Sequence, residues 1–150
     1  MGVSFVLNDD LAKVLRNVSK DFQKDAEQVL LKSGDILNKY LTDEVENNNV
    51  LSDAQKELLH RDIDNKIIYS SPNLVQSEAG WLFKKYDALN PVTGVLAIWM
   101  EYGTKERVTK TGQRRGFIHP AHFVQKARKR ASKEINALHE RLIKEKLNNG

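Results

Sequence analysis

The stretches that decide the fold of this 150-residue chain are Trp99-Met100-Glu101-Tyr102-Gly103-Thr104 and Gly116-Phe117-Ile118-His119-Pro120-Ala121-His122-Phe123. The first ends an apolar segment in a polar turn that contains a glycine. The second brings the chain back as a short apolar run that enters a helix through Pro120, because proline is tolerated in the first turn of a helix. The sequence therefore predicts an apolar element, a charged loop over residues 103–116 and a long final helix.

The final helix is predicted to run from residue 120 to about residue 147, because apolar residues recur there at three- and four-residue steps. The stripe consists of Val124, Ala127, Ala131, Ile135, Leu138, Leu142 and Leu147. The opposite side is crowded with Lys126, Arg128, Lys129, Arg130 and Lys133. Two positions of the stripe are alanines, and such small side chains allow another helix to approach closely.

A second long amphipathic helix is predicted over residues 9 to about 45, with Asp9 or Asp10 as its N-cap. Gly34 is the position at which a kink or break is expected, since glycine costs about 1 kcal/mol relative to alanine inside a helix. The apolar stripe of this helix is narrow. It therefore needs another surface to cover it, within the domain or on a neighbouring subunit.

The middle of the chain supplies the β structure. Ser52 and Gln55 form a capping-box pattern that opens a short helix over residues 53–65. Ile67-Ile68-Tyr69 is a β-prone run, and residues 79–86 are a second strand candidate, with a turn at Asn90-Pro91. Phe117-Ile118 is a candidate edge strand. The predicted fold is α+β, a single domain over residues 1–150 with long N-terminal and C-terminal helices packed on an antiparallel sheet of two to four strands.

The charge of the chain is distributed unevenly. Of 24 basic and 20 acidic residues, residues 101–150 hold 13 basic and 5 acidic ones, so this part carries +8 and the first hundred residues carry −4. Faces of opposite sign steer association with other chains or with a polyanion. The alternative interpretation is a solvated basic helix without a partner.

Several classes of protein and site are disfavoured by composition. The chain has no cysteine, which excludes disulfides, thiolate metal sites and cysteine nucleophiles. No apolar run approaches the roughly 20 residues that span a membrane, so we expect no membrane segment. The first ten residues lack a basic region followed by a long apolar one, so we expect no signal peptide.

Catalytic candidates are few. Ser70 and Ser71 stand in a turn beside a proline, without the glycine-flanked elbow that activates a serine nucleophile. His60, Asp62 and Asp64 offer an imidazole and two carboxylates on or near a short helix, but residues two apart do not share a helix face. We therefore expect no enzymatic activity, and we keep an enzyme built on His60, Asp62 and Asp64 as a remote alternative.

Metal and cofactor motifs are also weak. His119 and His122 have the three-residue spacing that lets two imidazoles share a metal on one helix face. His119, however, precedes a proline and is therefore pushed out of helical geometry, and no third ligand is evident. The segment Gly112-Gln113-Arg114-Arg115-Gly116 is flexible and cationic but lacks the strand–loop–helix setting of nucleotide sites. We expect no metal and no cofactor.

The ordered series quoted at the start, an aromatic-Glu-aromatic-Gly-Thr element, a variable loop and a proline before the final helix, resembles the tail-completion or head–tail joining proteins of long-tailed bacteriophages and prophages. The likeness covers roughly residues 90–140. It implies that residues 94–102 form a short helix, although β propensity favours a strand there. In such a helix Thr93 would be the cap and Gly103 would follow the last turn. Residues 42–66 match no motif of that family.

The resemblance implies a non-enzymatic virion protein at the head–tail junction or tail terminus. Subunits of that family form a ring, commonly six-fold, around the DNA channel, and their partners are other connector or tail proteins. Such a protein is found in the virion, and in the host cytoplasm during assembly. Glu101, Tyr102, Gly103 and Thr104 would position the loop. The loop itself would contact DNA nonspecifically or an acidic partner through Lys105, Arg107, Lys110, Arg114 and Arg115.

Two interpretations of the basic residues remain open. A solvated loop tip is the alternative to a phosphate-contacting loop. A small nucleic-acid-binding protein is the alternative to a connector subunit, although aromatic residues are not interleaved with the basic ones as a single-strand stacking surface requires. Salt-sensitive binding to DNA would distinguish a nucleic-acid-binding protein from a connector subunit. Activity lost on His60→Ala would support the enzyme.

Overall fold

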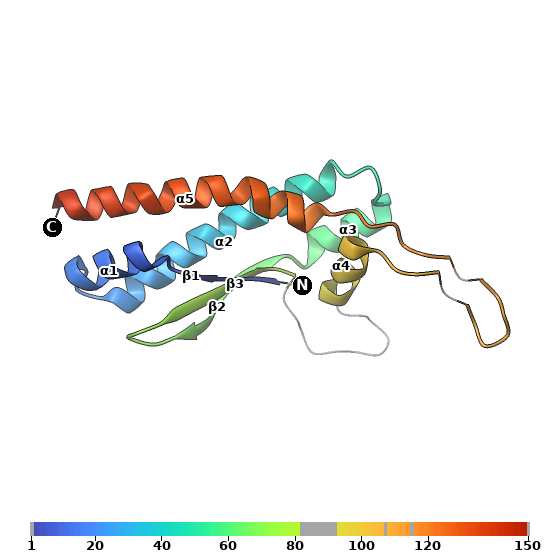
Figure 1. The fold of residues 1–150 in the computed structure, drawn as a ribbon, viewed down its shortest axis with the longest axis horizontal. Coiled ribbons are helices and arrows are strands. Elements are labelled where there is room, and N and C mark those ends of the chain that lie inside the picture. Colours follow the sequence, from blue (N-terminus) through green and yellow to red (C-terminus); the bar gives the residue numbers. More distant parts are fainter. Residues whose placement is uncertain (1, 82–92, 107, 115, 150) are drawn as a thin grey trace.

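Two long helices lie along a three-stranded sheet in the computed structural model, which describes residues 2–81, 93–106, 108–114 and 116–149 (Figure 1). Helix α2 (Phe22–Glu46) covers one face of the sheet, and helix α5 (Phe123–Asn149) packs along α2. The predicted α+β class, with long helices on a small antiparallel sheet, is confirmed.

The sheet has the strand order β1-β3-β2, and both pairings are antiparallel. Strand β3 (Val75–Gly80) lies in the centre, between β1 (Gly2–Val6) and β2 (Asp64–Ser70). The side chains of Val75, Ser77 and Ala79 are buried on the face that α2 covers. A bulge between Ile67 and Tyr69 shifts the register of β2 against β3.

The observed strands differ from the predicted ones in two places. Strand β1 was not expected, although Val3 and Phe5 alternate with smaller or polar neighbours in the way that a strand with one covered face requires. The strand expected over residues 79–86 is instead β3, which ends at Gly80, where φ is 109°. Glycine adopts this backbone conformation without a steric penalty. The next residue, Trp81, is buried in the core. Residues 82–86 and the predicted turn at Asn90-Pro91 lie outside the described residues.

The N-terminal helix is two helices rather than one. Helix α1 (Asp9–Val18) is capped by Asn8, whose side chain accepts a hydrogen bond from the backbone N–H of Leu11 at 2.8 Å, so neither Asp9 nor Asp10 is the N-cap. The break falls at residues 19–21, after which Asp21 caps α2. An N-cap side chain satisfies a backbone donor that the new helix leaves free. The Asp21 cap, which accepts from the backbone N–H of Lys24 at 3.1 Å, marks where the second helix begins.

Gly34 does not break α2. It is buried in mid-helix, and a Cβ atom there would lie 2.3 Å from Oδ1 of Asn65 on β2. The Asn65 amide is held in place, because its Nδ2 donates to the carbonyl of Leu31 at 2.7 Å and to the carboxylate of Asp35 at 3.0 Å. Gly34 therefore allows close contact between the helix and β2.

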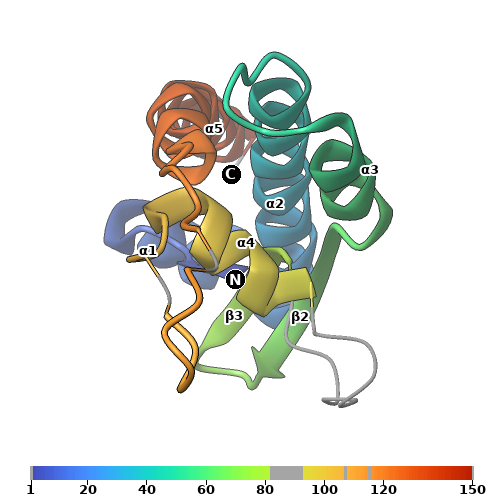
Figure 2. The ribbon, with the colours of Figure 1, turned by 90° about the vertical axis from the view of Figure 1, so that its right-hand side faces the viewer.

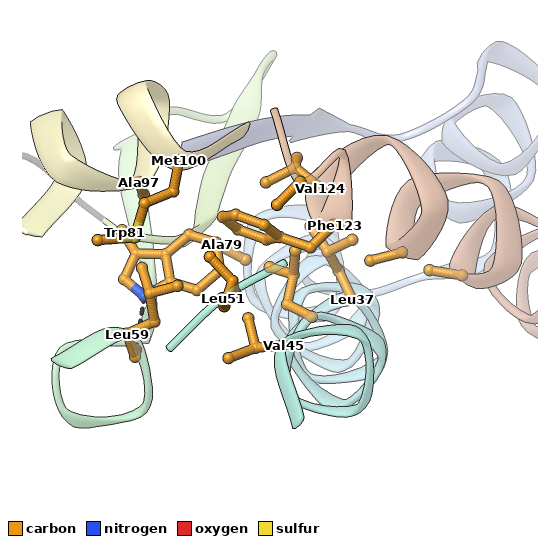
Figure 3. Close-up of a cluster of buried hydrophobic side chains, with 14 of the residues drawn as sticks. Leu37, Val45, Leu51, Leu59, Ala79, Trp81, Ala97, Met100, Phe123 and Val124 are labelled. Carbon is orange, nitrogen blue, oxygen red and sulfur yellow. Dashed lines mark hydrogen bonds between the residues drawn. The ribbon is translucent and has the colours of Figure 1, made fainter. Parts of the chain in front are cut away.

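Helix α3 (Asp53–Arg61) begins with the predicted capping box, in which Ser52 and Gln55 exchange side-chain and backbone hydrogen bonds. It ends earlier than the predicted residue 65, because β2 begins at Asp64. The main hydrophobic core lies where α3, α2, the sheet, the start of α5 and helix α4 (Thr93–Tyr102), through Ala97 and Met100, meet (Figure 3). Its centre is Trp81, whose Nε1 donates to the carbonyl of Leu59 at 2.6 Å and whose ring meets that of Phe123 edge-on at 5.3 Å. Within the described ranges, the structure contains no helix with the length and hydrophobicity of a membrane span.

Candidate functional site

The segment that the sequence singled out joins two helices. Residues 94–102 are helical, as the resemblance implied, and belong to α4 (Thr93–Tyr102). Gly103 follows with φ of 75°, the left-handed state that commonly ends a helix. Pro120 lies outside the helix that it was predicted to begin, since α5 starts at Phe123. Residues 103–122 are therefore the connection, and Figure 2 shows α4 at the end of the molecule beside the start of α5.

Glu101 is the N-terminal cap of α5, supplied from another helix. Its side chain is 1% exposed, and its carboxylate accepts hydrogen bonds from the backbone N–H groups of Val124 at 2.8 Å and Gln125 at 2.9 Å. These are donors of the first turn of α5, which have no partner within the helix. The negative charge also lies at the positive end of the helix dipole. Glu101 therefore fixes the end of α4 to the start of α5.

Backbone hydrogen bonds extend this connection. The N–H groups of Ala121 and His122 donate to the carbonyls of Met100 at 2.9 Å and of Glu101 at 3.2 Å. Thr104 and Ile118 exchange two further bonds, since each backbone N–H donates to an oxygen of the other residue at 2.9 Å. We call this unit, residues 101–104 bonded to residues 118–125, the α4–α5 clamp. The predicted edge strand at Phe117-Ile118 is absent, because Ile118 pairs with Thr104 alone rather than with the sheet.

Gly103 is required by the clamp on two grounds. Its positive φ is costly for other residues. In addition, a Cβ atom at this position would lie 2.7 Å from the carbonyl oxygen of Ile118 and 2.9 Å from Cδ of Pro120. The Glu-Tyr-Gly-Thr sequence thus has a physical reason at three of its four positions: a buried carboxylate, a residue without a side chain and a hydroxyl acceptor.

The loop held by the clamp extends away from the helices (Figure 1). Its tip is closed by a bridge between Val108 and Arg114 and by a bond from the N–H of Thr109 to the carbonyl of Gln113 at 2.9 Å. Of the five basic residues predicted to act here, Lys105, Lys110 and Arg114 are exposed. Arg107 and Arg115 lie outside the described residues.

Tyr102, the remaining residue of the motif, belongs to an apolar face of α4. It is 65% exposed and Trp99, one turn earlier, is 40% exposed. The one charged residue of α4, Glu101, is turned inward. Beside this face, Tyr102, Arg128, Lys129 and Ser132 line a groove of about 540 Å³. A helix that is apolar on every side is usually covered on every side, so this face is suited to contact with another molecule.

The candidate catalytic and metal residues make other contacts. Nε2 of His60 lies 2.9 Å from a carboxylate oxygen of Glu46, while Asp62 pairs with Arg61 at 3.4 Å and Asp64 accepts from the N–H of the next residue. The ring of His119 meets that of Phe117 at 4.5 Å. Over the described residues, no group of three or more His, Cys, Asp or Glu side chains is arranged to hold a metal ion.

One buried polar pair was not foreseen from the sequence. His139 on α5 is 5% exposed, and its Nε2 lies 3.0 Å from the hydroxyl of Ser33 on α2, which also donates to the carbonyl of Val29. Burial lowers the pKa of His139 below 6.5, because the charged imidazolium loses its hydration. The signal was present in the sequence: His139 stands four residues after Ile135, within the apolar stripe of α5.

Comparison of the chain with models of protein families, with curated proteins and with solved structures finds no match.

Proposed function

We propose that this chain is a non-enzymatic structural subunit of a bacteriophage or prophage particle, located at the head–tail junction or the tail terminus. In this proposal several copies form a ring, six-fold in the commonest arrangement, and bind connector or tail proteins. The protein is part of the virion and is present in the host cytoplasm during assembly. Neither a cofactor nor a membrane takes part.

The α4–α5 clamp is the observation that carries the proposal. The resemblance assigned Glu101, Tyr102, Gly103 and Thr104 the task of positioning the following loop. The carboxylate of Glu101 and the pairing of Thr104 with Ile118 fix both ends of that loop to the helices. A loop fixed at its base extends in a defined direction, as a part that must reach a neighbouring protein requires.

The surfaces beside the clamp support a role in assembly. Exposed Trp99 and Tyr102 are of the residue types that dominate binding energy at protein interfaces. The loop adds exposed cations, which in a ring face either the passing duplex or an acidic partner. Contact with phosphates is independent of sequence and is weakened by salt.

The alternative that an observation still favours is a small nucleic-acid-binding protein. Lys105, Lys110 and Arg114 are exposed on one extended loop, and the start of α5 adds further lysines and arginines. One loop supplies few phosphate contacts to a single subunit. Tight binding therefore needs the repetition that a ring provides. Tight binding of duplex DNA by the free monomer at physiological salt would favour the alternative.

The test is deletion and complementation in the genome that carries the gene. After particle production is induced, deletion should leave heads and tails unjoined or DNA lost from heads, and the wild-type gene should restore complete particles. A gene with Glu101→Ala should fail to restore them, because the clamp is lost. The matched control is Glu106→Ala, which removes an exposed glutamate of the loop and its exposed ion pair with Arg114 at 3.6 Å but leaves the clamp intact. Complete particles from the deletion strain, or purified particles that lack this protein, would contradict the proposal.

A further inference from the structure

We propose that neighbouring copies in the ring meet head to tail, with the lysines on the outer face of α5 in one copy against the acids on the outer face of α3 in the next. We name these surfaces the lysine row (Lys126, Lys129 and Lys133) and the acid pair (Asp53 and Glu57). This inference rests on the proposed function as a ring subunit, and it specifies the contact between subunits.

The lysine row is an exposed surface with no ion-pair partner among the residues that the structure describes. Its members are three and four residues apart and therefore lie on one face of α5. All three are exposed, and they lie opposite the buried Ala127 and Ala131. None of them makes an ion pair within the described ranges of the chain. The neighbouring Arg130 differs, because it is bound to Glu44 at 2.8 Å and stacks over the ring of Tyr40.

The acid pair is the corresponding surface of α3. Asp53 and Glu57 are four residues apart, both are exposed, and neither has an ion-pair partner among the residues that the structure describes. The nearby cations have contacts of their own, since Lys56 donates to the carbonyl of Glu46 at 2.8 Å and Arg61 pairs with Asp62. The acid pair lines a shallow groove of about 570 Å³ together with Glu46 and with three basic residues, Lys56, His60 and Arg61.

The two helices that carry these surfaces lie on opposite sides of α2, as Figure 2 shows. Both helices rest on the same core residue, because Trp81 bonds to Leu59 of α3 and contacts Phe123 at the start of α5. The surfaces are therefore at the same end of the molecule. Different patches on opposite sides make a heterologous contact, in which every copy binds two neighbours and a ring closes if the rotation allows.

A second copy explains both surfaces, whereas a nucleic acid explains only one. A polyanion would bind the lysine row and would leave the acid pair without a partner. Contacts between exposed charges are individually weak and screened by salt. The association between free subunits should accordingly be weak, strongest at low salt, and strengthened when many contacts close together in a ring.

Charge reversal and its compensation provide the test, read by sedimentation velocity at low salt. One variant carries Lys126→Glu, Lys129→Glu and Lys133→Glu, and a second carries Asp53→Lys and Glu57→Lys. Each alone should associate about tenfold or more weakly than wild type, because attractive pairs become repulsive ones. A mixture of the two variants should associate again, and so should one chain that carries all five changes. Circular dichroism checks that each variant is folded.

The matched control reverses three exposed lysines at the other end of the chain, Lys13→Glu, Lys20→Glu and Lys24→Glu, and should associate like wild type. A wild-type chain that stays monomeric, or a lysine-row variant that associates normally, would overturn the inference. So would a lysine-row variant that loses only binding to a duplex DNA probe of mixed sequence. Complementation by the wild-type gene decides the proposed function separately, since it does not depend on which surfaces meet.

Discussion

Replacing Glu101 tests whether one buried carboxylate joins the two halves of the site. Its two hydrogen bonds go to Val124 and Gln125, and it is 1% exposed. Loss of a helix N-cap costs about 1 kcal/mol. A buried N–H group left without a partner costs about 1–3 kcal/mol, and Val124 is such a buried residue. Glu101→Ala should therefore lower the free energy of unfolding by about 3 kcal/mol.

Glu101→Gln should lower the free energy of unfolding by about half as much as Glu101→Ala. The amide keeps one acceptor oxygen but loses the negative charge that is favourable at the helix N-terminus. The assay is urea unfolding followed by circular dichroism, with Glu106→Ala as the control. The side chain of Glu106 is exposed on the loop, so its removal should change stability by less than about 0.5 kcal/mol. A Glu101→Ala variant as stable as the Glu106→Ala control would mean that the Glu101 carboxylate does not hold the start of α5.

Four further predictions concern other parts of the chain. Gly34→Ala should destabilise the fold by about 1–2 kcal/mol because of the contact with Asn65; a gain of about 1 kcal/mol from helix propensity alone, read by urea unfolding, would contradict that packing. Wild-type stability should fall as the pH drops below 6.5 toward the lowered pKa of His139, because the unfolded chain takes up a proton before the native state does. His139→Leu should flatten this slope in urea titrations at several pH values, and an unchanged slope would exclude His139 as its source. Neutralising the five basic residues of the loop should leave the melting temperature unchanged but impair particle completion or DNA retention, and a normal yield of DNA-filled particles would remove the role assigned to those charges. Backbone amides of residues 105–115 should exchange rapidly in the free subunit, because the loop buries little apolar surface, and strong protection there would contradict this.

Periodic and local signals predicted much of the fold. The apolar stripe of α5 and the capping box of Ser52 and Gln55 each depend on residues within a few positions of one another. The capping box is confirmed, and so is the stripe from Val124 to Ile135, whereas Leu147 at its end is exposed. The break before α2 was missed because Val18 and Phe22 keep the four-residue apolar spacing across the polar residues 19–21. The caps Asn8 and Asp21 decide where each helix begins. Strand β1 was missed because it is stabilised by pairing with β3, which is remote in sequence.

The candidate site was predictable in its residues but not in its mechanics. The positive φ of Gly103 follows from its position after a helix. Glu101 caps a helix that begins more than twenty residues later in the chain. No local rule predicts this contact, because it depends on where α4 and α5 meet in space. The same holds for Gly34, which the sequence presents as a helix breaker and which the structure explains by the nearness of Asn65.

The most direct measurement is a cryo-EM reconstruction of the particles made by the genome that carries this gene. We expect a closed ring of this chain at the head–tail junction or the tail terminus, with α4 and the loop against a neighbouring protein or the duplex. We also expect the lysine row of each copy to face the acid pair of the next. Complete particles whose density at both places is filled by other chains would contradict this expectation.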